Sequence, residues 1–154
     1  MNIQKYKLFL AFYRADSETS TFLDKTISFI DGSKFSHVEI AVELNNGLYE
    51  CYSSSGRDGG VRKKNINLKD NKWVLYEIPE YLLTYDRIVK IYDQENKCKY
   101  DFFGLLSTKI EYIKGSNSKW YCSEYCAYNL GLKDFNNMGV KDLNKWADKN
   151  LYKL

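Results

Sequence analysis

The sequence predicts an α+β protein, with an antiparallel sheet in the first half of the chain and helices mostly in the second. Residues 36–44 alternate between apolar and polar side chains, which is typical of a half-buried strand. The turn-forming sequence Asn45-Asn-Gly47 follows directly and indicates a hairpin. After Pro79 the apolar residues recur at helical spacing instead. The 154 residues suffice for a single domain, residues 1–154, with a core of its own.

About five strands are expected. Each is a short stretch of alternating or β-branched and aromatic residues bounded by turn formers or a polar break: residues 5–13, 36–44, 48–53, 61–68 and 73–78. In the second of these, Val38 and Ile40 share one face, while His37 and Glu39 share the other. The hairpin turn makes the strand around Glu50 a close neighbour of the strand that carries His37.

Helices are expected where the apolar spacing changes from two to between three and four. They cover residues 21–30, 80–95, 101–113 and 141–149, with one more that begins close to Trp120 or Tyr121. The polar turn formers of residues 115–118 come just before that last helix, so Cys122 falls in its first turn.

Charge and composition exclude several classes of protein. The formal net charge is only +3, and the basic residues are scattered among acidic ones with only Arg62-Lys-Lys64 as a short run, so a nucleic-acid partner is not expected. The apolar run near Met1 is too short for a secretory signal, and no window has the length of a membrane-spanning helix, so we expect a cytoplasmic protein. Abundant Tyr, Lys and Asn fit an AT-rich genome such as that of a low-GC bacterium or its phage. A phage origin would place the protein in the host cytoplasm or in the virion.

The cysteines predict neither disulfides nor a metal site. Without a secretion signal, the four cysteines do not argue for a disulfide framework. The chain contains no Cys-x-x-Cys pair and a single histidine, so a structural zinc site is not expected. No cofactor is expected either.

Cys122 is the candidate nucleophile. Unpaired backbone N–H groups and the positive end of the dipole gather at a helix N-terminus and favour a thiolate there. The alternative is a buried core cysteine, because cysteine is among the most buried residue types. The other cysteines fit the nucleophile role less well: Cys51 points to the face opposite Glu50, Cys98 lies in a charged stretch, and Cys126 is one turn into the helix.

His37 is the single candidate for a general base, and Glu50 is the candidate for the group that orients it. A regular hairpin about Asn46-Gly47 places position 37 opposite a residue near 55 or 56. Contact between His37 and Glu50 therefore requires a bulge or another strand order. The alternatives are a hydrogen-bonded core histidine and a solvated strand glutamate.

Four motifs occur in a distinctive order. They are Ser-His-Val-Glu-Ile-Ala-Val from Ser36, Leu-Tyr-Glu-Cys before Gly-Gly-Val, Tyr-Asp-Phe-Phe-Gly-Leu-Leu from Tyr100, and Trp-Tyr-Cys-Ser-Glu from Trp120. This order resembles that of the circularly permuted NlpC-like papain-fold proteins, in which the histidine strand precedes the cysteine helix. That superfamily includes cell-wall peptidases and lecithin–retinol acyltransferase-like lipid enzymes. The resemblance spans roughly residues 37–132 and implies a permuted papain-like fold.

The resemblance implies that Cys122 is the nucleophile, His37 the base and Glu50 the residue that orients the base. Tyr100 and Asp101 match a recurring Tyr-Asp pair, taken as structural or substrate-side. Two further candidates for substrate or oxyanion contacts are Tyr13, for which core packing is the alternative, and Ser36, which directly precedes His37.

The expected function is hydrolysis of an amide, such as a peptide bond in cell-wall material, through an acyl-enzyme. The expected partner is a peptide or acyl substrate, with peptidoglycan-derived peptides the first choice. One alternative is a lipid acyl hydrolase or acyltransferase of the same fold. Another is a binding or virion structural module without catalysis. The oligomeric state does not follow from the sequence.

Overall fold

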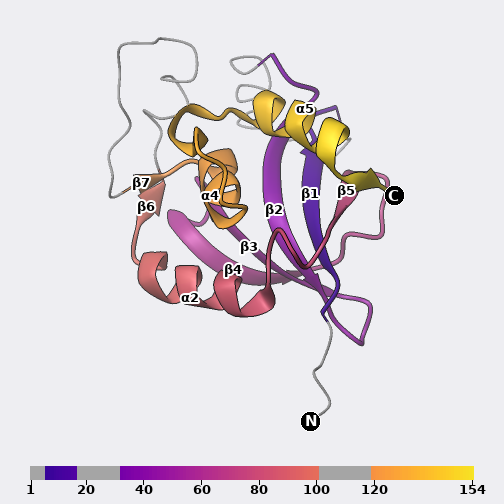
Figure 1. Ribbon diagram of the computed structural model, residues 1–154, viewed down its shortest axis with the longest axis horizontal. Coiled ribbons are helices and arrows are strands. Elements are labelled where there is room, and N and C mark those ends of the chain that lie inside the picture. Colours follow the sequence, from indigo (N-terminus) through magenta and orange to yellow (C-terminus); the bar gives the residue numbers. More distant parts are fainter. Residues whose placement is uncertain (1–5, 17–31, 101–118) are drawn as a thin grey trace.

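The computed structural model describes residues 6–16, 32–100 and 119–154. Within these residues the protein is α+β, with one eight-stranded sheet in the order β7-β6-β4-β3-β2-β1-β5-β8. The helices pack on one face of this curved sheet, with α4 and α5 above the central strands and α2 across its lower end (Figure 1). The helices expected at residues 21–30 and 101–113 lie outside the described residues.

The five predicted strands are confirmed, with ends shifted by at most three residues. They are β1 (Leu8–Arg14), β2 (Phe35–Glu43), β3 (Tyr49–Ser55), β4 (Gly60–Ile66) and β5 (Trp73–Ile78). Three two-residue strands extend the sheet at its edges: β6 (Lys99–Tyr100), β7 (Lys119–Trp120) and β8 (Tyr152–Lys153). All pairings are antiparallel except that of β6 with β7, which is parallel.

The β2–β3 hairpin has the register that the turn predicts. Gly47 has a φ of 79°, a left-handed conformation that glycine adopts without strain. The ladder runs from Glu43 opposite Tyr49 to Ile40 opposite Tyr52 and ends there. The first residues of β2 and the last of β3 are therefore not paired with each other.

The described residues contain three α-helices after β5: α2 (Tyr85–Glu95), α4 (Cys122–Asn129) and α5 (Val140–Asn150), with a short 3₁₀ turn, η1 (Phe135–Asn137), between the last two. Helix α2 begins five residues later than predicted because Thr84 caps it, with its hydroxyl accepting from the backbone N–H of Arg87 at 3.3 Å. Helix α4 begins at Cys122 and α5 at Val140, each within two residues of its predicted start.

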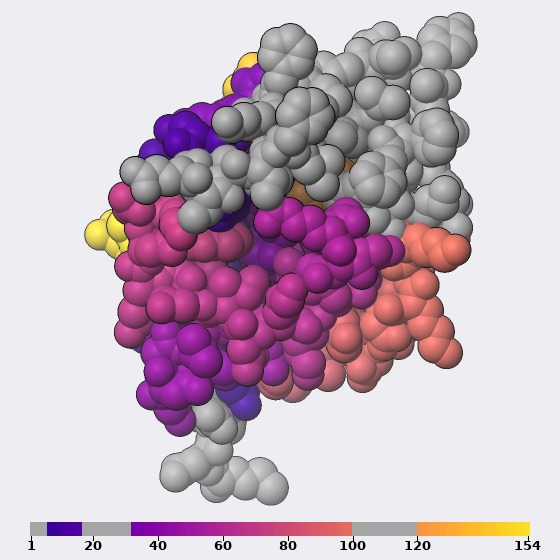
Figure 2. Space-filling view, turned by 180° about the vertical axis from the view of Figure 1, so that it is seen from behind, coloured from indigo at the N-terminus to yellow at the C-terminus, as the bar shows by residue number. Residues whose placement is uncertain are grey.

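The main core lies between the helices and the sheet. Val38, Ile40 and Val42 of β2 face it together with residues of all three helices, and a smaller cluster lies on the opposite face around Phe9 and Cys51. Seen from behind, most of the coloured surface belongs to the magenta and pink segment that contains β3, β4 and β5 (Figure 2). None of the helices in the described segments is long and apolar enough to cross a membrane.

Candidate active site

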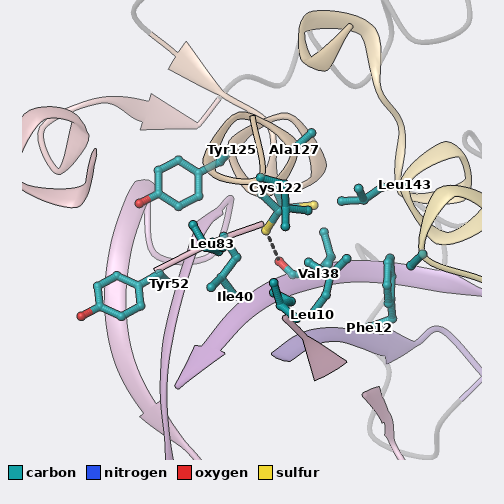
Figure 3. Close-up of a cluster of buried hydrophobic side chains, with 14 of the residues drawn as sticks. Leu10, Phe12, Val38, Ile40, Tyr52, Leu83, Cys122, Tyr125, Ala127 and Leu143 are labelled. Atoms are coloured by element: carbon teal, nitrogen blue, oxygen red, sulfur yellow. Dashed lines mark hydrogen bonds between the residues drawn. The ribbon is translucent and has the colours of Figure 1, made fainter. Parts of the chain in front are cut away.

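The start of α4 is fixed by contacts on both sides of the helix boundary. The carboxylate of Glu124 accepts from the backbone N–H of Tyr121 at 3.2 Å and caps the first turn. On the other side, Ser54 of β3 donates from its hydroxyl to the carbonyl of Trp120 at 2.7 Å. Cys122, the first helical residue, is thus held against the sheet, and Figure 3 shows it within the buried cluster above Val38.

Helix α4 contacts the sheet beside the point where the β2–β3 ladder ends. Val38 precedes Ile40 on β2 and is not paired with β3, so its carbonyl accepts hydrogen bonds from side chains and not from the β3 backbone. It accepts from Ser53 Oγ at 2.7 Å and from Cys126 Sγ at 3.7 Å, the contact dashed in Figure 3. The separation of the two strands therefore admits the start of α4 next to the beginning of β2, where His37 lies.

The His37 ring lies between the side chains of Glu39 and Cys122. Its Nε2 lies 2.7 Å from Oε1 of Glu39, and the side chain of Cys122 is close enough to help raise the pKa of the ring. Because Glu39 occupies Nε2, Nδ1 is the nitrogen left for the thiol. Cys122 is completely buried, whereas the His37 side chain keeps 19% of its surface exposed.

Glu39 is a completely buried carboxylate held by two cationic partners. Arg62 of β4 donates from Nη1 to Oε2 at 2.6 Å and from Nη2 to Oε1, so the guanidinium contacts both oxygens. A second carboxylate, Asp58 in the β3–β4 turn, accepts from Arg62 Nε at 3.0 Å. Cys122, His37, Glu39, Arg62 and Asp58 thus form one continuous chain of side-chain contacts.

The charges along this chain shift two pKa values strongly. Burial alone lowers the pKa of His37, but the Glu39 carboxylate and the Cys122 side chain outweigh it and raise the pKa from 6.5 to about 9. Burial raises the pKa of Glu39, but Arg62 and then His37 outweigh it and lower the pKa from 4.5 to about 2. At neutral pH the pair is therefore an imidazolium beside a carboxylate.

The predicted contact between Glu50 and His37 is wrong. Glu50 lies directly opposite Val42, five residues along β2 from His37, which is about 16 Å at the rise of a strand. Directly opposed residues also share a face, so Glu50 lies with Val42 on the face that the helices cover, whereas the alternation of β2 places His37 on its other face. Its Oε1 accepts from Tyr52 and, at 3.1 Å, from Tyr85 of α2, which makes Glu50 a link between β3 and that helix.

The three other predicted site residues are Tyr13, Ser36 and Tyr100. Tyr13 is directly opposite His37 on β1, and its ring packs on Trp73 with centroids 5.0 Å apart. Ser36 is completely buried at the beginning of β2. The backbone of Tyr100 pairs with Trp120, two residues before Cys122, and Asp101 lies outside the described residues. Roles for these residues in binding substrate stay predictions.

The remaining cysteines are held as thiols. Burial raises the pKa of Cys51 and that of Cys126. Burial and then a hydrogen bond to Glu95 raise the pKa of Cys98 to about 11. Across the described ranges, no three or more His, Cys, Asp or Glu side chains are grouped so as to hold a metal ion.

Sequence reasoning missed Glu39 and Arg62. The alternation of β2 already places His37 and Glu39 on one face, so the strand period was a sufficient signal for the carboxylate. Arg62 lies opposite Ser53 on β4 and reaches Glu39 across an intervening strand. In the sequence it is only the first residue of a short basic run.

Comparison with known proteins adds no family to this geometry. No model of a known protein family matches the chain, and no curated protein matches it either.

Proposed function

We propose that this protein is a cysteine hydrolase with a circularly permuted papain-like fold, and that it cleaves an amide bond. The observation that carries the proposal is the position of His37 between Cys122 and Glu39. A thiol at the first residue of a helix, an imidazole beside it and a carboxylate on the far nitrogen are the three parts that nucleophilic thiol catalysis requires.

The permuted papain-like assignment is supported by chain order and by the motifs. The strand with His37 precedes the helix with Cys122, which is the order found in the NlpC-like proteins that the sequence resembles. Glu39 belongs to the same Ser-His-Val-Glu motif as His37, so the carboxylate comes from within a motif that supports the resemblance.

In the proposed reaction, the Cys122 thiolate attacks the amide carbonyl carbon, and an S–C bond forms. The backbone N–H groups of the first turn of α4 stabilise the oxyanion. Imidazolium His37 donates its proton to the amide nitrogen, the C–N bond breaks and the amine leaves. Water then attacks the thioester, His37 takes a proton from it, and the C–S bond breaks to give a carboxylic acid and the free thiolate.

The charge state of His37 suits the first of these steps. With a pKa of about 9, His37 is protonated at neutral pH and can act first as an acid toward the leaving group. Glu39 stabilises the imidazolium without taking its proton, because its own pKa is lowered to about 2. Attack on a substrate also requires an opening over Cys122, which is completely buried.

The deciding experiment offers the protein two kinds of substrate. Purified protein, Cys122→Ala and a Cys98→Ser control are each incubated with soluble peptidoglycan fragments and with short-chain lipid esters, and the products are identified by mass spectrometry. We expect new amines from the peptidoglycan fragments with wild type and Cys98→Ser but not with Cys122→Ala. Cleavage of the esters alone would favour a lipid acyl hydrolase or acyltransferase of the same fold. Release of neither product would contradict catalysis and favour a binding or virion module.

A further inference from the structure

Arg62 is the group that allows a charged Glu39 to exist where it lies. A carboxylate removed from water is costly unless it is paired and hydrogen-bonded. Glu39 is completely buried, and Arg62 donates to both of its oxygens. The guanidinium is itself largely covered, with 15% of its side chain exposed, so the contact is poorly screened by solvent.

The geometry of Arg62 is fixed from its other side. Its Nε donates to Asp58 at 3.0 Å, and Asp58 also accepts from Lys64 at 3.0 Å. The planar guanidinium therefore donates from Nη1 and Nη2 to Glu39 and from Nε to Asp58 in the β3–β4 turn. This leaves the guanidinium little freedom to turn away from the carboxylate.

We propose that Arg62 is a positioning residue for the Cys122–His37 pair: by holding both oxygens of Glu39, it keeps that carboxylate charged and turned toward the imidazole. The role as a positioning residue rests on the proposed hydrolase function. The linkage of Arg62 to His37 through Glu39 can be measured without any enzymatic activity.

Within the described part of the chain, four groups that titrate or carry charge act on Glu39 or are acted on by it. They are His37 on the same strand, Arg62 on β4, Cys51 on β3 and Cys126 on α4. Burial raises the pKa of both cysteines, so they remain neutral at moderate pH. Cys122 also faces His37. Among the four, the positive charges that oppose the carboxylate at neutral pH are therefore those of Arg62 and His37.

Without Arg62, the buried pair of Glu39 and His37 would have one proton between them and no further cation. A neutral acid beside a neutral imidazole is then favoured over two buried charges. His37 would become neutral at a lower pH than in the wild type. If Arg62 instead acted on His37 directly, removing its positive charge would move the titration of His37 to higher pH.

His37 is the single histidine of the chain, so its NMR titration needs no assignment. We expect a midpoint near pH 9 in the wild type and at least two pH units lower in Arg62→Gln, with Arg62→Lys between the two. The matched control is Lys64→Gln, which removes a neighbouring cation bound to the same Asp58 but not to Glu39. This control should titrate as the wild type does. An unchanged or higher midpoint in folded Arg62→Gln overturns the proposal.

A second set of variants covers the case in which Arg62→Gln does not fold. Glu39→Gln and the double variant Glu39→Gln/Arg62→Gln carry no unpaired buried carboxylate, and we expect both to fold. If Arg62 acts through Glu39, adding Arg62→Gln to Glu39→Gln does not lower the His37 midpoint further. A further fall of one pH unit or more would show a different route and would overturn the proposal. Absence of hydrolase activity in the wild type would leave these titrations unchanged and would contradict only the proposed function.

Discussion

The Nε2 atom of His37 lies 2.7 Å from Oε1 of Glu39, two residues further along the same strand. Side chains two residues apart in a strand point to the same face, so β2 alone fixes this pair. The orientation of the imidazole therefore does not depend on the register of the β2–β3 hairpin. What the tertiary fold adds is Arg62 from one side and Cys122 from the other.

Cys122 is expected to be the first cysteine that iodoacetamide labels at pH 6.5. It is the first residue of α4 and lies beside the imidazolium of His37, a setting in which cysteines act as nucleophiles. The pKa of Cys98 is raised to about 11, and burial also raises those of Cys51 and Cys126. Peptide mass spectrometry over a time course measures the four rates.

The control for this labelling is His37→Ala, which should slow the reaction of Cys122 at pH 6.5 by about tenfold or more. The rate at Cys98 should not change, because its thiol is hydrogen-bonded to Glu95 instead. Equal rates at Cys122 in the two proteins would contradict a role of His37 in activating Cys122.

Glu39→Gln and Glu50→Gln should differ in their effects on Cys122 labelling and on stability. Each replaces one glutamate, fully buried at position 39 and partly buried at position 50. Glu39→Gln removes the anion that keeps His37 protonated, so Cys122 should be labelled more slowly at pH 6.5. Glu50→Gln weakens the acceptor for Tyr52 and Tyr85 and should cost about 1 kcal/mol of stability without changing the labelling. Urea unfolding and the labelling assay measure the two effects, and slower labelling in Glu50→Gln would return the orienting role to Glu50.

The stabilisation that His37 provides should disappear in alkaline solution. The folded-state pKa of His37 is about 9 and its ordinary value is 6.5, so the folded state binds the proton more tightly. The contribution is fully present below pH 6.5 and is lost as pH rises through 9. The stabilisation lost across this pH range is about 3 kcal/mol in total. The difference in unfolding free energy between wild type and His37→Gln, measured in urea at pH 6, 8 and 10, should fall accordingly.

Glu39 should give the opposite dependence at the acid end. Its pKa is lowered from 4.5 to about 2, so its contribution is present above pH 4.5 and is lost as pH falls through 2. A stability difference between wild type and Glu39→Gln that is constant from pH 5 down to pH 2 would contradict this.

Local rules predicted those parts of the fold that depend on neighbouring residues. Alternation gave β2, the Asn46-Gly47 turn gave the hairpin register, and the turn formers before Trp120 placed the start of α4 within two residues of Cys122. The two-residue strands β6, β7 and β8 carry no such signal, because each consists only of a short pairing with a distant segment.

Local rules also found only some of the residues that meet at the proposed site. His37 is the single histidine and Cys122 is the cysteine at a helix start, so residue type and local position identified both. Glu50 was chosen because the hairpin brings its strand close, yet proximity of strands does not set distance along them or the face of the side chain. Arg62 reaches Glu39 from two strands away in the sheet, and no local pattern encodes that contact.

Gly60→Ala should destabilise the protein by about 3 kcal/mol. Gly60 is the first residue of β4 and has a φ of 153°, and an added Cβ would lie 2.1 Å from the carbonyl oxygen of Cys98. The clash is with backbone, so β4 or the segment leading into β6 must move. Gly59→Ala is the matched control, because Gly59 also has a positive φ, 83°, but no atom lies within 4 Å of its added Cβ. Backbone strain alone should cost that control about 1 kcal/mol. Urea unfolding of the two variants separates the clash from the backbone strain. Equal losses of unfolding free energy would show that the clash with Cys98 adds nothing to the cost of Gly60→Ala.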